Sequence, residues 1–202
     1  MAATTKITLS AKELSLVTNA EWILTKQQII QKVYLLFSAQ IPVIKSVLTT
    51  PGLVLPEEAI SSVPKIYKGE NYLQLPYVML DYPRCFSGKD IFAIRTMFWW
   101  GNFFSITLHI AGKYKEILGE KIRSNEQLAS GRLYIGVNED QWQHHFEENN
   151  FLPLCDLSKE EQLSFLGEND FIKLALKFPL QEWNDMPAML QEGYHEIAAI
   201  LS

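Results

Sequence analysis

The densest group of reactive side chains in the sequence is the segment 81–85, DYPRC, which brings together a carboxylate, a phenol, a guanidinium and a thiol. Segments that follow strands often carry function, because a rigid scaffold positions them. Arg84 could bind an anionic group through two parallel hydrogen bonds, and Cys85 could act as a thiolate if a nearby cation lowered its pKa. The alternative is a rigid turn in which Arg84 pairs with Asp81 or Asp90. No histidine near Cys85 in the sequence supports a nucleophile.

The densest set of metal-ligand types is His144-His145 followed by Glu147 and Glu148. Adjacent side chains on a helix point about 100° apart, so two neighbouring histidines rarely bind one metal ion. We therefore interpret this set as a solvated helix end and expect neither a metal site nor a cofactor.

Two β-prone runs, residues 91–100 and 103–110, are separated by Gly101-Asn102. A two-residue connection led by glycine is typical of a type II′ hairpin, because its first position needs a positive φ. The turn then pairs the last residue of the first run with the first residue of the second.

Side chains alternate across a strand, so this register assigns each residue of the hairpin to a face. One face combines large aromatic side chains with hydroxyls and an imidazole: Phe92, Ile94, Thr96, Phe98, Trp100, Phe103, Ser105, Thr107 and His109. Apolar surface with a few polar groups is typical of small-ligand pockets, and it is equally typical of homodimer interfaces. The remaining alternative is that a helix of the same chain covers this face and the hydroxyls bond locally.

Arg95 is the one charged residue on the other, mainly apolar face of the predicted hairpin. A buried arginine needs a carboxylate or an anionic ligand, because an unpaired buried charge is costly. It could also form an internal ion pair or extend its stem to solvent at the sheet edge. The residues that we expect to contact a ligand are Arg84, Arg95, Thr96, Phe98, Trp100, Phe103, Thr107 and His109.

Composition limits the classes of function. The sequence of 202 residues is 48% hydrophobic and 20% charged, so it can form a core and is not intrinsically disordered. A net charge of −5 with 18 Lys+Arg argues against a nucleic-acid binder, which needs a basic surface. No apolar run reaches the roughly 20 residues of a membrane span, and no signal peptide is visible. With two distant cysteines, we expect a cytoplasmic protein without membrane or nucleic-acid partners.

The elements that must position these residues follow from periodicity. Residues 1–50 form a mainly helical region, with capping patterns at Ser10, Asn19 and Thr25. A strand over 72–82, the hairpin, and helices alternating with short strands complete the chain. In the strand over 171–178, Lys173 and Lys177 point to the solvent side. We predict a single α+β domain over 1–202, with an antiparallel sheet of about five strands, a central β-hairpin and helices packed mainly on one face.

This order of elements, with the strand containing Leu75-Pro76-Tyr77 before an aromatic hairpin, resembles the uncharacterised YktB-like family of bacterial proteins. The resemblance covers most of the chain from Gln27 onward as a pattern of elements. It implies an α+β fold, and the family has no established activity to transfer.

Two functions fit the sequence. The first is a non-catalytic small-ligand-binding or interaction domain that uses the aromatic hairpin face, as a homodimer. The second is a small cytoplasmic enzyme with general acid/base chemistry at the Asp81–Arg84 loop and His109. The sequence contains no nucleotide-binding glycine motif, no zinc-protease motif and no serine-hydrolase motif that would decide between them.

Overall fold

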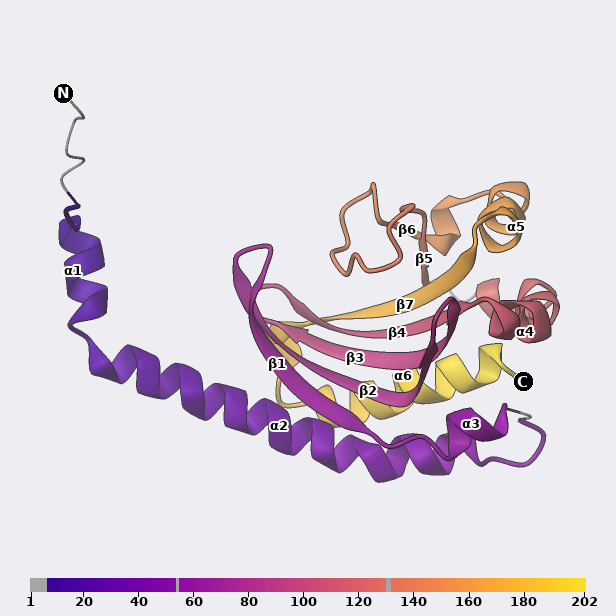
Figure 1. Cartoon of the computed structure of the whole chain (residues 1–202), viewed down its shortest axis with the longest axis horizontal. Coiled ribbons are helices and arrows are strands. Elements are labelled where there is room, and N and C mark those ends of the chain that lie inside the picture. The colour runs from indigo at the N-terminus through magenta and orange to yellow at the C-terminus, as the bar shows by residue number, and fades with distance from the viewer. Residues whose placement is uncertain (1–6, 54, 130–131) are drawn as a thin grey trace.

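A computed structural model describes residues 7–53, 55–129 and 132–202. The α+β class with an antiparallel sheet is confirmed, but the sheet has seven strands instead of about five (Figure 1). The strand order is β1-β2-β3-β4-β7-β5-β6, and every neighbouring pair is antiparallel. The strands are β1 Lys65–Tyr72, β2 Leu75–Ser87, β3 Asp90–Trp99, β4 Phe103–Ala111, β5 Tyr134–Gly136, β6 Phe151–Pro153 and β7 Phe171–Pro179.

Helices pack on one face of this sheet. Their apolar stripes share the largest core cluster with the inward side chains of β2, β3, β4 and β7. The α-helices are α1 Ala11–Val17, α2 Ala20–Leu48, α3 Glu57–Ile60, α4 Lys113–Arg123, α5 Lys159–Glu168 and α6 Met186–Ile200. Short 3-10 helices occupy Glu126–Ala129, Leu154–Asp156 and Leu180–Glu182. In Figure 1, α2 and α6 run side by side beneath the sheet, and α1 projects away from it.

Several local predictions at the N-terminus are confirmed. Ser10 caps α1 through a reciprocal capping box, and Asn19 caps α2 by accepting from the Trp22 N–H. Thr25, the other predicted cap, lies inside α2. Pro42 lies inside α2 without dividing it. Residues 1–6 of the predicted helical region 1–50 lie outside the described residues.

The predicted hairpin is present as β3 and β4, but its predicted register is wrong by one residue. Trp99, rather than Trp100, pairs with Phe103. The loop is Trp100-Gly101-Asn102, closed by the Asn102 N–H donating to the Trp99 carbonyl at 3.0 Å, and Gly101 supplies the positive φ of 74°. The Trp100 N–H instead donates to the carbonyl of Pro76 on β2. A neighbouring strand thus draws Trp100 out of the hairpin ladder, and this reassigns the side chains of β4 relative to those of β3.

The second face of the sheet is covered by a loop instead of helices. Residues 137–150 connect β5 to β6 without helix or strand, and we call them the 137–150 loop. In Figure 1 the connection between β5 and β6 lies on the side of the sheet opposite to α2 and α6. The predicted helix through Trp142 and Phe146 is therefore not formed. Irregular loops of this length are uncommon in compact domains, and those that are ordered often carry function.

None of the helices in the described part of the chain is long and apolar enough to cross a membrane.

Candidate functional site

The candidate site is a group of buried polar side chains on the loop-covered face. The corrected register creates it, because Arg95 pairs with Thr107, and His109 lies between Ala93 and Lys173. Neighbouring strands lie about 4.8 Å apart, so these two rows place their side chains next to each other on one face. We define the polar cluster as Asp81, Arg95, His109, His144 and Lys173.

A bidentate ion pair forms one end of the polar cluster. Arg95 donates from Nε to Asp81 Oδ1 at 2.7 Å and from Nη2 to Asp81 Oδ2 at 3.0 Å. Both side chains are buried, with 9% and 4% of their surfaces exposed. The Tyr67 hydroxyl donates to the same carboxylate at 3.2 Å. Burial raises the pKa of Tyr67 to about 12, with a further contribution from the Asp81 charge, so the phenol stays protonated and keeps donating.

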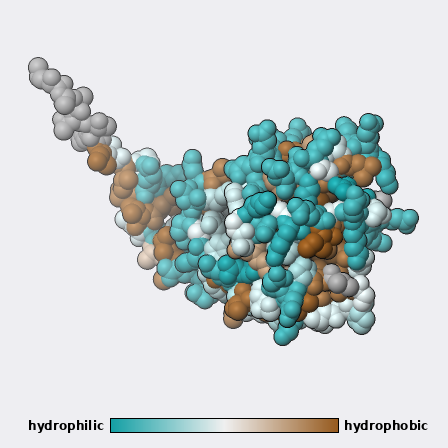
Figure 2. All heavy atoms as spheres, turned by 45° about the vertical axis from the view of Figure 1, so that its right-hand side comes forward, coloured by the Kyte–Doolittle hydropathy of each residue, from teal (hydrophilic) through white to brown (hydrophobic). Residues whose placement is uncertain are grey.

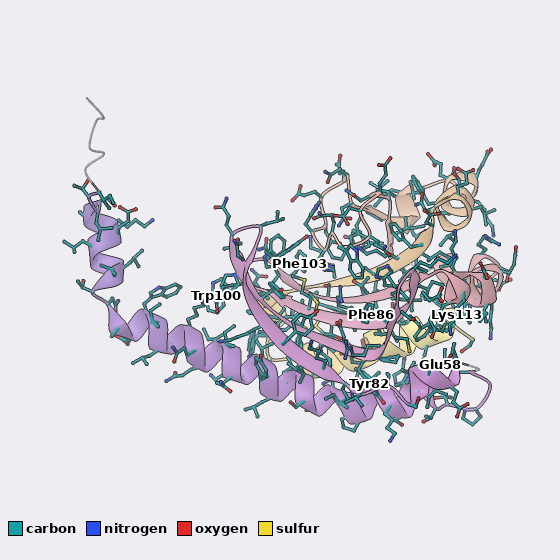
Figure 3. The ribbon with its side chains drawn as sticks, viewed as in Figure 1. Glu58, Tyr82, Phe86, Trp100, Phe103 and Lys113 are labelled. Carbon is teal, nitrogen blue, oxygen red and sulfur yellow. The ribbon has the colours of Figure 1, made fainter. Side chains whose placement is uncertain are left out.

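A bulge in β2 brings Arg84 to the same face. Asp81 pairs with Arg95 and Arg84 with Ala93, so three steps along β2 match two along β3. Such bulges redirect side chains and are common near active sites. The Arg84 guanidinium lies 5.8 Å from the centre of the Phe86 ring, and its buried Nε has no hydrogen-bond partner among the described residues. Figure 3 shows Phe86 near the end of the sheet where α4 begins.

The 137–150 loop supplies an acceptor to each of three donors on the sheet. The Nη1 of Arg95 donates to His144 Nε2 at 3.3 Å, His109 Nε2 lies 2.9 Å from Gln141 Oε1, and the Lys173 amine donates to the Gln143 carbonyl. Because a guanidinium only donates, His144 must accept through Nε2. An amide oxygen only accepts, so His109 carries its proton on Nε2. The covered face of the sheet therefore presents donors, and the loop provides the oxygen and nitrogen acceptors.

Burial keeps the three basic groups from carrying their full charge. It lowers the pKa of His109 to about 3, with Lys173 and Arg95 adding repulsion and the Gln141 contact opposing the change. Burial likewise lowers the pKa of His144 well below its ordinary value. Burial and the Arg95 charge lower the pKa of Lys173 to about 7. At neutral pH both imidazoles are thus uncharged, and Lys173 is only partly protonated.

No carboxylate in the described part of the chain lies at contact distance from Lys173. Among the described residues, the carboxylate ion pairs within 4.0 Å involve Lys26, Arg95, Lys113, Arg123 and Arg132. Because a buried ammonium without a counter-ion is costly, its site favours either the neutral amine or an anion from outside.

A groove borders the polar cluster. Its volume is about 660 Å³, and it lies between the start of α4 and the turn that leads into β7. Gln141 lines this groove, and the same side chain contacts His109. Lys89, Lys115 and Arg123 lie along the groove together with several carboxylates. A small movement of the Gln141 side chain would therefore connect the groove with the polar cluster.

The eight residues predicted to contact a ligand do not share one face. Arg95, Thr107 and His109 lie together, and Arg84 is on the same face. Phe103 is also on this side, but it packs in an apolar cluster with Met79, Met97 and Trp99. Thr96, Phe98 and Trp100 belong to the helix-covered side.

The helix-covered half of the predicted aromatic face is filled by the protein itself. The Thr96 hydroxyl lies 2.7 Å from the Tyr194 hydroxyl of α6, and Phe98 packs on Trp183. Trp100 packs edge-on against Trp22 of α2. Figure 3 shows Trp100 toward the N-terminal part of α2. The prediction that Phe98 and His109 share one face of the hairpin is therefore wrong, because the actual register places these residues on opposite sides.

Sequence reasoning missed the contributions of Lys173, Gln141 and His144. Lys173 was predicted to face solvent, yet it is 2% exposed, because the 137–150 loop covers it and β7 is a central strand. His144 was assigned to a solvated helix end, whereas it lies in the 137–150 loop against Arg95. The sequence could have indicated this site if a hairpin register shifted by one residue had been considered, because that register places His109 and Arg95 on the same side of the sheet.

Cys85 does not have the environment of an activated nucleophile. Burial raises the pKa of its thiol, and the largest opposing effect is a hydrogen bond with Tyr114. Both Cys85 and Cys155 are free thiols. The described residues contain no group of three or more metal-ligating side chains, and His144 and His145 are not joined by Glu147 or Glu148 in such a group.

No protein-family model, curated protein or solved structure matches this chain. The resemblance to the YktB-like family stays a prediction from the order of elements.

Proposed function

We propose that the protein binds a small anionic molecule at the polar cluster, with the 137–150 loop as a movable cover. The observation that carries this proposal is the set of three sheet donors, on Arg95, His109 and Lys173, that meet acceptors from one loop. A carboxylate or phosphate offers several acceptor oxygens in a small volume, so it could replace these loop atoms. It would also supply the negative charge that Lys173 lacks.

The groove beside Gln141 supports the same proposal. Small-molecule sites are usually concave, with a few polar groups that fix the orientation of the ligand. The anionic group would lie at the polar cluster, and the rest of the molecule would occupy the groove lined by Lys115 and Phe171. This keeps the ligand-binding role expected for the hairpin and transfers it to the face with Arg95 and His109.

The test uses inorganic phosphate, sulfate and acetate as probes, with thermal unfolding and calorimetric titration as measurements. An anion at about 100 times its Kd adds about 2.7 kcal/mol to the free energy of unfolding. We expect at least one of the three anions to raise the unfolding temperature, and Lys173→Met to abolish the increase. Lys177→Met is the matched control, because Lys177 is an exposed lysine on the same strand.

Two results would contradict the proposal. One is that none of the three anions stabilises the protein. The other is that Lys173→Met and Lys177→Met both respond like the unmodified protein, which would place the bound anion elsewhere on the surface.

The pKa of Lys173 near 7 favours a second candidate, general acid/base catalysis. An acid or base is most effective when its pKa lies near the working pH. Asp81 is held in its ion pair with Arg95, so Lys173 beside His109 is the better candidate for moving a proton. Once a bound molecule is identified, proton NMR of the mixture separates the two functions. Conversion that depends on Lys173 indicates an enzyme, and an unchanged bound molecule indicates a binding protein.

A further inference from the structure

The outer face of α2 carries an uncharged stripe with no partner in the described chain. Six exposed residues form the stripe: Ala20, Leu24, Gln28, Gln31, Leu35 and Ala39. At 100° per residue, Leu24 and Leu35 lie about 20° apart around the helix, and both lie roughly opposite the buried Val33. Leu24 is 56% exposed and Leu35 is 71% exposed. Solvent-facing helix surfaces are normally charged or polar, so two exposed leucines within an uncharged stripe of about 28 Å indicate an interaction surface.

The spacing of this stripe is the same in both directions. Alanine, leucine and glutamine follow one another at four-residue steps from Ala20, and glutamine, leucine and alanine follow in reverse order to Ala39. A two-fold dimer requires that residue i meets residue j of the second copy, and that j meets i in return. Antiparallel packing of α2 on α2 satisfies this condition at every position of the stripe. Alanine then faces alanine, leucine faces leucine, and glutamine faces glutamine.

We propose that two copies of this chain form a homodimer by antiparallel packing of α2 along this stripe. The two-fold axis passes between Gln28 and Gln31, where amide side chains can hydrogen-bond across the interface. Leu24 of each copy meets Leu35 of the other. Like charges are not opposed in this register, because Glu21 lies opposite Ser38 and Lys32 opposite Gln27.

An apolar groove beside the stripe provides the second part of the contact. The groove has a volume of about 350 Å³ and lies between α2 and the start of α6, with Leu35, Leu36 and Trp183 among its lining residues. Gln40 also lines it, and its buried Oε1 has no hydrogen-bond partner among the described residues. In the proposed register, residues 19–27 of the second copy cross this groove. They include the exposed Ile23 and Leu24.

The projecting N-terminal arm fits this arrangement. We use the term arm for residues 7–24, which extend from the body in Figure 1 and carry apolar side chains that Figure 2 shows as brown surface. Every residue of α1 is exposed, and isolated helices of this length are marginal in water. Dimerisation would place the α2 part of each arm on the apolar groove of the other copy, which gives these residues a packing partner.

We expected the homodimer to use the aromatic hairpin face, but the part of that face with Thr96 and Phe98 is covered by the protein itself. The α2 stripe is a different surface, so the inference stands independently of ligand binding at the polar cluster.

Light scattering after size-exclusion chromatography, and sedimentation over a range of concentrations, test the dimer. We expect a mass twice that of the 23.2 kDa chain. Leu24→Lys and Leu35→Lys should each weaken the dimer by at least about 100-fold, because each substitution removes two apolar contacts from a symmetric interface. Ile117→Lys on α4 is the matched control, since Ile117 is 62% exposed and lies outside the stripe.

A charge-pairing variant tests the antiparallel register. With Leu24→Lys and Leu35→Glu in the same chain, antiparallel packing pairs each lysine with a glutamate, whereas parallel packing opposes like charges. We expect this double variant to dimerise more strongly than Leu24→Lys alone. The proposal is overturned by a monomeric protein, by a dimer insensitive to both lysine substitutions, by a double variant weaker than Leu24→Lys, or by a stripe that binds only an unrelated protein.

Discussion

The burial of Lys173 changes its protonation and therefore the pH dependence of stability. Its pKa is about 7 in the folded protein, compared with an ordinary value of 10.5. Between these two values the unfolded chain holds a proton that the folded protein does not, so stability rises with pH in this window. Below pH 7 both states are protonated, and the full penalty of the buried ammonium applies.

Lys173→Met should therefore stabilise the protein at neutral pH and remove this dependence. The advantage of the variant over the unmodified protein should shrink by up to about 1.4 kcal/mol for each pH unit above about 7. Urea unfolding at a series of pH values measures this difference in the free energy of unfolding, with Lys177→Met as the control at an exposed lysine. Identical pH dependence of Lys173→Met and the unmodified protein would show that the amine keeps its ordinary pKa.

His109 produces a pH dependence of the same sign, but at acidic pH. Its pKa is lowered from 6.5 to about 3, mainly by burial. The unfolded chain binds the extra proton between these values, so stability falls as pH decreases through this range. Below about pH 6, the free energy of unfolding of His109→Gln should decrease less steeply than that of the unmodified protein. The difference in slope should be up to about 1.4 kcal/mol for each pH unit. His195→Gln, at an exposed position on α6, should follow the unmodified protein.

At the level of elements, local sequence signals predicted the structure well where short-range contacts decide it. The capping box at Ser10 needs only four consecutive residues, and it is present in the structure. The hairpin was also predicted, but its register depends on a hydrogen bond from Trp100 to Pro76, which is distant in sequence. Strand β1 was missed, because its polar residues do not alternate with apolar ones.

The candidate site was predicted only in part for the same reason. Arg95 and His109 were singled out because a charge and an imidazole stand out among apolar neighbours in the hairpin sequence. Their convergence requires the corrected register, and the burial of Lys173 requires the 137–150 loop to cross β7. Neither is encoded by a local pattern, since a loop without periodicity gives no indication of the surface that it covers.

Tyr72 links this loop to β1 and should control how readily it opens. Its hydroxyl oxygen accepts hydrogen bonds from the backbone N–H groups of His144 and His145, at 2.6 and 3.0 Å. Tyr72→Phe removes these two bonds, at about 0.5–1.5 kcal/mol each, together with the longer bond that the hydroxyl donates to Gln143 Oε1 at 3.4 Å. Amide hydrogen exchange of the 137–150 loop should therefore become at least about 5-fold faster, while exchange in α2 should not change.

Tyr77→Phe is the control for this experiment. The Tyr77 ring packs 6.3 Å from the Tyr72 ring, but no hydrogen bond of its hydroxyl occurs among the described residues. In the Tyr77→Phe variant, the amides of the 137–150 loop should exchange at the same rates as in the unmodified protein. Equal exchange in the Tyr72→Phe variant would mean that the hydroxyl does not hold the loop.

Across the whole molecule, the polar cluster and the α2 stripe lie on opposite sides of the sheet. In Figure 1 the connection between β5 and β6 lies over one face of the sheet, and α2 packs beneath the other. The stripe residues of α2 are exposed. No side chain of the stripe lines the groove beside Gln141. Sites that share no residues and no intervening mobile element are expected to act independently.

Anion binding and dimerisation should therefore be separable by mutation. The monomeric Leu35→Lys variant should bind the stabilising anion with a Kd within about 2-fold of the dimer, because coupling between sites requires differential contacts in two states. Lys173→Met should keep the mass of the dimer while losing the anion. Calorimetric titration and light scattering on the same samples measure both properties. If Leu35→Lys loses anion binding while its fold is unchanged, the second copy must contribute to the binding site.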